Sequence, residues 1–229
     1  MTLQEIREAI SHLTRVERED LAEWILNSAE FDSRVAEAAV PYGQSRKSGY
    51  MTADEYLDFE LSSPVKHEYV AGLIFAMTGV RFHHAVIVGD LMLHLKNHLR
   101  GGPCEAVSND MKVRIRADES EFYYYPDVVV TCEPQGGQSL VLDKPRLIIE
   151  VLSPSTERTD RSEKRLNYRH IASLEEYVLV AQRPYEVTLH RRSENWSPLV
   201  LTAPDSIVEF RSIGFSITLE QIYERVKRS

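Results

Sequence analysis

Two acidic residues and a lysine lie close to short apolar runs in the middle of this chain. Asp127 opens one apolar run, residues 128–130, and Glu150 ends a second one, residues 147–149; Lys164 follows in the next charged segment. An ionised carboxylate that is buried without a partner costs several kcal/mol, so two such acids at one place favour a cation between them. Mg²⁺ binds one or two carboxylates and keeps its other positions for water or phosphate oxygens. The pattern therefore predicts a metal-dependent phosphodiesterase site.

Each of these residues also has a purely structural interpretation. Asp127 follows a proline and could cap the edge of a strand, and Glu150 could form a salt bridge with Arg146 or Lys164. Asp160 and Lys164 have i, i+4 spacing, so they could pair on a helix surface, which stabilises a helix by only a few tenths of a kcal/mol. The spacing alone leaves these alternatives open.

The elements that must position these residues form a mixed α/β (α+β) pattern. Hairpin-like runs are more frequent than regular strand–helix alternation, which predicts a mixed sheet and not a doubly wound one. Helices are predicted at 52–59, 83–100, 159–171 and 219–226. Strands are predicted at 68–70, 73–77, 105–107, 111–116, 122–131, 147–152, 176–180, 186–191, 199–202 and 207–210.

The chain before this domain has a different character. Residues 1–30 show the periodicity of two short amphipathic helices, and residues 31–49 have no clear period and are predicted to be a linker to the main domain, residues 50–229. A helical hairpin of this size cannot bury a core alone, so it must pack on the main domain or on a partner. Pairing through the apolar face around Trp24 predicts a homodimer.

Composition predicts an ordinary globular protein of the cytoplasm. Of the 229 residues, 43% are apolar and 27% are charged, as in typical globular domains. No apolar run approaches the roughly 20 residues of a membrane span, and the acidic start does not resemble a signal peptide. Cys104 and Cys132 form no metal-binding pattern and are expected to be two buried thiols in a reducing compartment.

The charge of the chain is acidic overall but uneven. The net charge of −8 argues against strong sequence-independent binding of nucleic acid, because such binding depends on lysine and arginine side chains that neutralise phosphates. Residues 81–116 and residues 144–170 nevertheless each carry a net charge of +3. A locally basic surface beside an acidic site is one interpretation, and ordinary solvated charged faces are the other.

The ordered motifs of the chain resemble one known family. Tyr125–Val130, Ile149–Thr156, and Asp160 with Lys164 and Tyr168 are similar to the motifs of the Uma-two family, restriction-endonuclease-like proteins of the PD-(D/E)xK nuclease superfamily. Further matches occur in the same order, and the resemblance runs from about Tyr50 to the C-terminus. They are Glu68 with Gly72, the helix led by His84, the strand Asn109–Val113, and the strand after Glu175.

The resemblance implies a restriction-endonuclease-like core that hydrolyses phosphodiester bonds in DNA. Asp127 and Glu150 would bind Mg²⁺ or Mn²⁺, and Glu68 would add a third carboxylate. The ion would activate a water and stabilise the attacked phosphate. Lys164 would steady the developing negative charge.

One departure from the superfamily pattern leaves a second function open. The superfamily lysine lies two residues after the second acid, on the same strand face, but here that position is Leu152. Within the resemblance, Lys164 is the replacement, provided that its helix folds back over the sheet. The alternative is a catalytically inactive member that keeps the fold as a nucleic-acid or protein interaction module.

Aromatic and imidazole side chains near the motifs favour structural roles. His84 is predicted to be a helix-start or packing residue and not a ligand. Tyr123, Tyr124 and Tyr125 could stack on bases, but alternate strand residues point to opposite faces, so packing explains them better.

Overall fold

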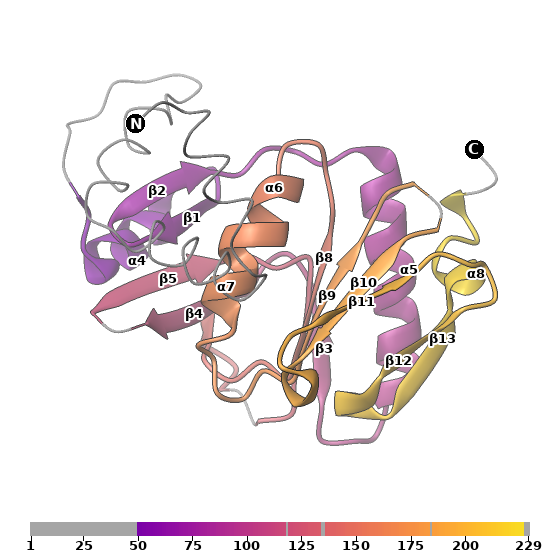
Figure 1. Cartoon of the computed structure of the whole chain (residues 1–229). Coiled ribbons are helices and arrows are strands. Elements are labelled where there is room, and N and C mark those ends of the chain that lie inside the picture. Colours follow the sequence, from indigo (N-terminus) through magenta and orange to yellow (C-terminus); the bar gives the residue numbers. More distant parts are fainter. Residues whose placement is uncertain (1–49, 118, 134–135, 184, 227–229) are drawn as a thin grey trace, which may run out of the picture. The chain divides into compact units, whose positions relative to one another are not determined.

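The computed structural model describes residues 50–117, 119–133, 136–183 and 185–226 (Figure 1). The predicted helical hairpin at 1–30 and the linker at 31–49 lie outside these residues, as does the predicted dimer contact around Trp24. The described residues all fall within one unit of the chain. None of its helices combines the length and the apolar character needed to cross a membrane.

A six-stranded mixed sheet forms the larger layer, with strand order β11-β10-β9-β8-β6-β3. Only β8 and β9 are parallel; the other neighbours are antiparallel. Its strands are β3 (Glu105–Val107), β6 (Val128–Thr131), β8 (Leu147–Val151), β9 (Glu176–Val180), β10 (Val187–Arg191) and β11 (Pro198–Leu201). The long helix α5 (Phe82–Leu99) lies along one face of this sheet in Figure 1.

The two faces of β8 belong to two different parts of the core. Leu147 and Ile149 pack in the cluster that includes Leu91 of α5, whereas Ile148 packs in a second cluster on the opposite face. All five residues of β8 are buried. A strand buried on both faces has a continuous apolar sequence, which explains why the run before Glu150 does not alternate.

The second layer is a five-stranded sheet with the order β2-β1-β5-β4-β7. Its strands are β1 (His67–Val70), β2 (Leu73–Ala76), β4 (Lys112–Ala117), β5 (Ser120–Tyr124) and β7 (Val141–Leu142). Helix α4 (Ala53–Ser62) begins at a capping box formed by Thr52 and Glu55. Its Tyr56 is buried against Tyr69 and Tyr123, so this helix is fixed to the sheet by an aromatic cluster.

The chain changes from one sheet to the other at Pro126. The sequence predicts one strand over 122–131, but the structure divides it into β5, in the smaller sheet, and β6, in the larger one. Proline has no N–H to donate to a strand partner, so pairing is interrupted there. The break places Asp127 at the junction of the two sheets.

The predicted charged helix is one continuous helical segment with an irregular middle. It consists of α6 (Glu157–Thr159), the π-helical turn η1 (Asp160–Lys164) and α7 (Arg165–Tyr168), and it ends earlier than predicted. Figure 1 shows this segment beside the strands of the smaller sheet. A single π turn inside a helix frequently marks a functional site. Here the turn contains both Asp160 and Lys164.

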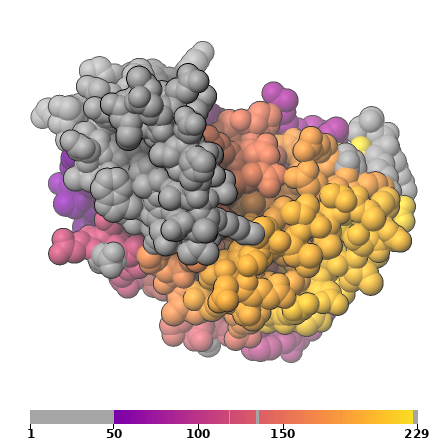
Figure 2. Space-filling model, viewed as in Figure 1, coloured from indigo at the N-terminus to yellow at the C-terminus, as the bar shows by residue number. Residues whose placement is uncertain are grey.

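A small antiparallel pair and a short helix end the described chain. These are β12 (Ile207–Phe210), β13 (Phe215–Thr218) and α8 (Leu219–Ile222). Strand β13 was not predicted, because its four residues follow directly after a 3₁₀ turn that closes at Gly214 in the left-handed region, φ 62°. In Figure 2 the C-terminal residues, coloured orange to yellow, lie together in one area of the visible surface.

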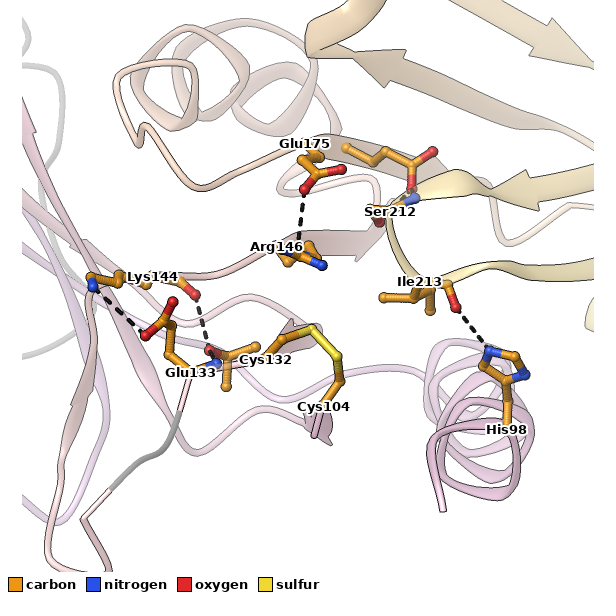
Figure 3. Close-up of a disulfide and its surroundings, with 11 residues drawn as sticks. His98, Cys104, Cys132, Glu133, Lys144, Arg146, Glu175, Ser212 and Ile213 are labelled. Carbon is orange, nitrogen blue, oxygen red and sulfur yellow. Dashed lines mark hydrogen bonds and ion pairs between the residues drawn. A yellow bond between two sulfur atoms is a disulfide. The ribbon is translucent and has the colours of Figure 1, made fainter. Parts of the chain in front are cut away.

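The prediction of two free thiols was wrong. Cys104 and Cys132 form a disulfide, and no free cysteine remains in the described part of the chain (Figure 3). Strands β3 and β6 pair with Glu105 opposite Thr131, so continuing that register by one residue places the two cysteines opposite each other. The bond therefore joins the edge strand β3 to its neighbour, and these cysteines no longer support a reducing compartment.

Reduction of this disulfide is expected to destabilise the protein. A cross-link between residues 28 apart restricts the unfolded chain, and the chain-entropy relation gives about 3–4 kcal/mol for a loop of this size. Urea unfolding with and without a phosphine reductant measures the change in the free energy of unfolding. Cys132→Ser is the matched control, because its stability should not respond to reductant. Two titratable thiols in denatured, unreduced protein would contradict the assignment.

Candidate active site

Lys164 lies at the centre of a buried group of carboxylates. Its Nζ is 2.8 Å from Glu68 Oε1, 3.3 Å from Glu150 Oε1 and 3.4 Å from Asp160 Oδ1. The Lys164 side chain is only 6% exposed, and Glu150 and Asp160 are equally well buried. We call Glu68, Asp127, Glu150, Asp160 and Lys164 the acidic cluster.

Three different elements bring this cluster together. Glu68 comes from β1 in the smaller sheet, Glu150 from β8 in the larger sheet, and Asp160 and Lys164 from the π turn η1. The hydroxyl of Tyr177, on β9, donates to the main-chain oxygen of Asp160 at 2.9 Å. That bond holds the π turn against the larger sheet.

Asp127 joins the cluster through hydrogen bonds to the backbone of β8 and to Glu150. Its main-chain N–H donates to Glu150 Oε2 at 3.1 Å, and its own Oδ2 accepts from the Val151 N–H at 2.7 Å. The register of β6 and β8 pairs Val128 with Ile149, so the next position along places Asp127 beside Glu150. The two acids predicted to converge are therefore direct neighbours.

Burial dominates the protonation behaviour of the cluster. It raises the pKa of the Glu150 carboxyl well above its usual range, although the Lys164 ammonium acts in the opposite direction. Burial likewise raises the pKa of Asp160. Burial alone would lower the pKa of Lys164, but the carboxylates of Glu150, Glu68 and Asp160 raise it well above its usual range. Lys164 is therefore a cation at neutral pH.

One structural alternative is present: Glu150 forms a salt bridge with Lys164 at 3.3 Å. Two others are not, and the first is a salt bridge from Glu150 to Arg146, which pairs with Glu175 at 3.3 Å instead. Asp160 and Lys164 do contact each other at i, i+4 spacing, but both are buried in the cluster and do not form a surface pair. Leu152 occupies the position at which the resemblance leads one to expect a lysine, and it packs in the apolar core. The lysine thus reaches Glu150 from a helix and not from the strand.

Asp160, a member of the cluster, and His84, which contacts it, were not predicted from the sequence to be metal ligands. Asp160 Oδ1 is buried and has no hydrogen-bond partner among the described residues, although the Lys164 ammonium lies 3.4 Å away. His84, predicted to be a packing residue, places its Nε2 3.1 Å from Asp127 Oδ2. The signal for Asp160 was its spacing to Lys164; nothing in the sequence pointed from His84 to Asp127.

The tyrosines beside the cluster are packing and hydrogen-bonding residues. Tyr124 is fully buried, and its hydroxyl donates to Glu163 Oε1 at 2.8 Å. The Tyr168 hydroxyl lies 3.4 Å from Glu150 Oε1, as a weak donor to that carboxylate. Tyr123 and Tyr125 are also buried, which confirms that packing explains the tyrosine run better than base stacking.

The donor set of the cluster is suited to a hard divalent cation, but Lys164 fills its centre. Within the described ranges, no three His, Cys, Asp or Glu side chains already stand in metal-binding geometry. Three carboxylates nevertheless contact one ammonium and Asp127 lies beside Glu150, and oxygen ligands of this type are those that Mg²⁺ and Mn²⁺ prefer. Asp160 Oδ1, which accepts no hydrogen bond from the described residues, is a further oxygen to which a cation could bind.

Comparisons with known proteins agree with this architecture. A protein from Anabaena variabilis ATCC 29413, described as "a putative nuclease belonging to DUF820", superposes with a TM-score of 0.62 at 19% identity, covering 76% of this chain and 98% of that one. The likeness shows that the two proteins share a fold, and the mixed α/β restriction-endonuclease-like prediction is confirmed.

Two relatives from Synechocystis sp. (strain ATCC 27184 / PCC 6803 / Kazusa) are more similar in sequence. "Uncharacterized protein slr1290" is 39% identical over 76% of this chain and 91% of its own length. "Uncharacterized protein sll1609" is 32% identical over 70% of this chain and 92% of its own length. The family model described as "Uma2: Putative restriction endonuclease" matches residues 53–220, which span both sheets and every residue of the acidic cluster. The chain therefore belongs to the Uma2 family.

Proposed function

We propose that this protein is a metal-dependent endonuclease that hydrolyses phosphodiester bonds in DNA. The observation that carries the proposal is the acidic cluster, in which residues from two sheets and a helix converge on one buried point. Membership of a family described as restriction endonucleases supports phosphodiester chemistry in particular. Asp127, Glu150 and Glu68 are the proposed ligands of Mg²⁺ or Mn²⁺, and Lys164 is the assisting cation.

The charge balance of the cluster supports a divalent cofactor. If all four acids are ionised, Lys164 compensates only one of their charges, and buried charges without compensation are strongly unfavourable. Burial raises the pKa of Glu150 and of Asp160, and neighbouring carboxylates raise both further. A cation beside these acids would favour their ionised forms instead. When bound, the ion would supply charge stabilisation and an activated water.

The residues of the chain have distinct tasks in this proposal. Glu68 has the most exposed carboxylate of the three that contact Lys164, with 16% of its side chain accessible, so it is the ligand nearest to entering substrate. Lys164 contacts that carboxylate at 2.8 Å, and its ammonium would donate to a phosphate oxygen of the substrate. Tyr168 and the Asp127 N–H hold the Glu150 carboxylate in place.

DNA is the proposed substrate, and a homodimer remains the predicted assembly. The two basic segments support contact with a polyanion, because residues 81–116 precede Asp127 along the chain and residues 144–170 contain Glu150, Asp160 and Lys164. The homodimer rests on the N-terminal hairpin, whose residues lie outside the described part of the chain.

A second candidate function is a non-catalytic interaction module with the same fold. Leu152 in place of the superfamily lysine favours it, as does the position of Lys164, whose ammonium contacts three carboxylates at the centre of the cluster. The two functions differ in one measurable property, since only the nuclease requires the acids to bind a divalent ion.

Nuclease activity should require both a divalent ion and the two central acids. Purified protein is expected to nick or linearise supercoiled plasmid in Mg²⁺ or Mn²⁺ and not in EDTA. Asp127→Asn and Glu150→Gln keep side-chain size and should lower the rate at least about 100-fold, corresponding to about 2.7 kcal/mol of transition-state stabilisation. Glu175→Gln is the matched control, because Glu175 is a half-exposed acid that pairs with Arg146 away from the cluster. Equal rates in all four proteins would exclude the assignment.

Removal of the central cation should destabilise the metal-free protein. Lys164→Met leaves three carboxylates without their buried partner, and breaking such a network costs about 3–5 kcal/mol. Lys66→Met is the control, because Lys66 pairs with the exposed Asp110 and such surface pairs contribute at most about 1 kcal/mol. Urea unfolding in EDTA measures both variants.

The same urea unfolding measurement can be repeated with Mn²⁺ in place of EDTA. A ligand that binds only the folded state stabilises it, so Mn²⁺ should recover more stability in Lys164→Met than it adds to the wild type. A Lys164→Met protein as stable as the wild type in EDTA would show that the ammonium does not hold the acids together.

A further inference from the structure

His84 makes a contact that packing alone does not explain. It is the third residue of α5 and is 4% exposed, yet no predicted role connects it with the acidic cluster. Its Nε2 lies 3.1 Å from Oδ2 of Asp127. The contact joins helix α5 to the junction between the two sheets. Asp127 lies there directly after Pro126, where strand pairing is interrupted.

The surroundings of the ring determine which nitrogen carries the proton. Oδ2 of an ionised Asp127 can only accept, so Nε2 must donate. The other nitrogen, Nδ1, is buried and has no partner in the described part of the chain. The contact therefore needs a proton on Nε2, whereas Nδ1 makes no contact that requires one.

The contact fixes one oxygen of Asp127 and leaves the other available. Oδ2 accepts both from His84 Nε2 and from the Val151 N–H, at 3.1 Å and 2.7 Å. Two donors arriving from different elements restrict rotation of the carboxylate about the Cβ–Cγ bond. Oδ1 is therefore the oxygen left for a cation.

We propose that His84 is a positioning residue that orients the Asp127 carboxylate toward a divalent cation held by the acidic cluster. The inference deepens the proposed function and rests on it. Hydrogen-bonding partners behind a metal ligand set its orientation, and their loss typically lowers metal affinity about 10- to 100-fold. His84 itself does not contact the reacting atoms in this assignment.

Mn²⁺ titration calorimetry on the full chain tests the role of the ring N–H. His84→Leu keeps the bulk of the side chain but removes the donor, and it should weaken Mn²⁺ binding about 10- to 100-fold. His84→Gln carries an amide N–H at nearly the reach of Nε2, so its affinity should lie closer to the wild type than to His84→Leu. His98→Gln is the matched control on the last turn of α5, where the ring contacts the Ile213 carbonyl instead.

A further pair of variants keeps the test decisive if His84→Leu does not fold. Asn is shorter than Gln, so His84→Asn cannot reach Asp127, and it should lose affinity where His84→Gln retains it. A purely structural role predicts equal Mn²⁺ affinity for folded Gln and Asn variants, and that result would overturn the inference.

The failures of the inference and of the proposed function are distinguishable. Wild-type affinity in folded His84→Leu, with cleavage intact, removes the positioning role and leaves the nuclease assignment standing. Absence of both Mn²⁺ binding and plasmid cleavage in the wild-type protein removes the nuclease assignment, and the role of His84 with it.

Discussion

The buried ammonium of Lys164 is the interaction on which the arrangement of this protein depends. It contacts carboxylates from β1, from β8 and from its own helical turn, so one side chain joins the smaller sheet, the larger sheet and the helix between them. Buried ions are tolerated only when their partners are well placed. The two sheets are therefore joined by charged side chains at the point where the chain concentrates its acids, in addition to the apolar cluster between them.

The chain reaches this arrangement by interrupting its regular elements. Pro126 ends strand pairing, so that β5 and β6 belong to different sheets and Asp127 lies where they separate. The π turn at Asp160–Lys164 is a second interruption, and the Tyr177 hydroxyl binds the Asp160 carbonyl oxygen within it. Both irregularities occur beside acids of the cluster. Local departures from regular geometry are expected to collect at functional sites, where a side chain must be aimed in a direction that an ideal strand or helix does not offer.

Apolar patterning predicts α5 and the buried strands, because each is determined by neighbouring residues along the chain. The convergence of Asp127 and Glu150 is also predictable, since Asp127 precedes one buried strand and Glu150 lies near the end of another. The division of the strand at 122–131 was missed although Pro126 is visible in the sequence, because proline alone does not say which sheet the next strand joins. The Cys104–Cys132 bond and the contact between His84 and Asp127 depend on register and on helix placement. These are set by tertiary packing, which no local pattern records.

The position of Lys164 on a helix, and not on β8, has a physical explanation in the surroundings of that strand. Leu152 occupies the strand position two residues after Glu150, and it packs in the apolar cluster between the sheets. A lysine there would have to place its ammonium within that cluster or bend back toward Glu150, and either choice would disrupt the packing around Tyr177 and Leu179. Because the ammonium comes from η1, strand β8 can keep an apolar residue at position 152 while the helix supplies the positive charge beside Glu150. The consequence is that the charge geometry depends on docking of the helix, which Tyr168 and Tyr177 secure through buried rings and hydroxyl contacts to Glu150 and Asp160.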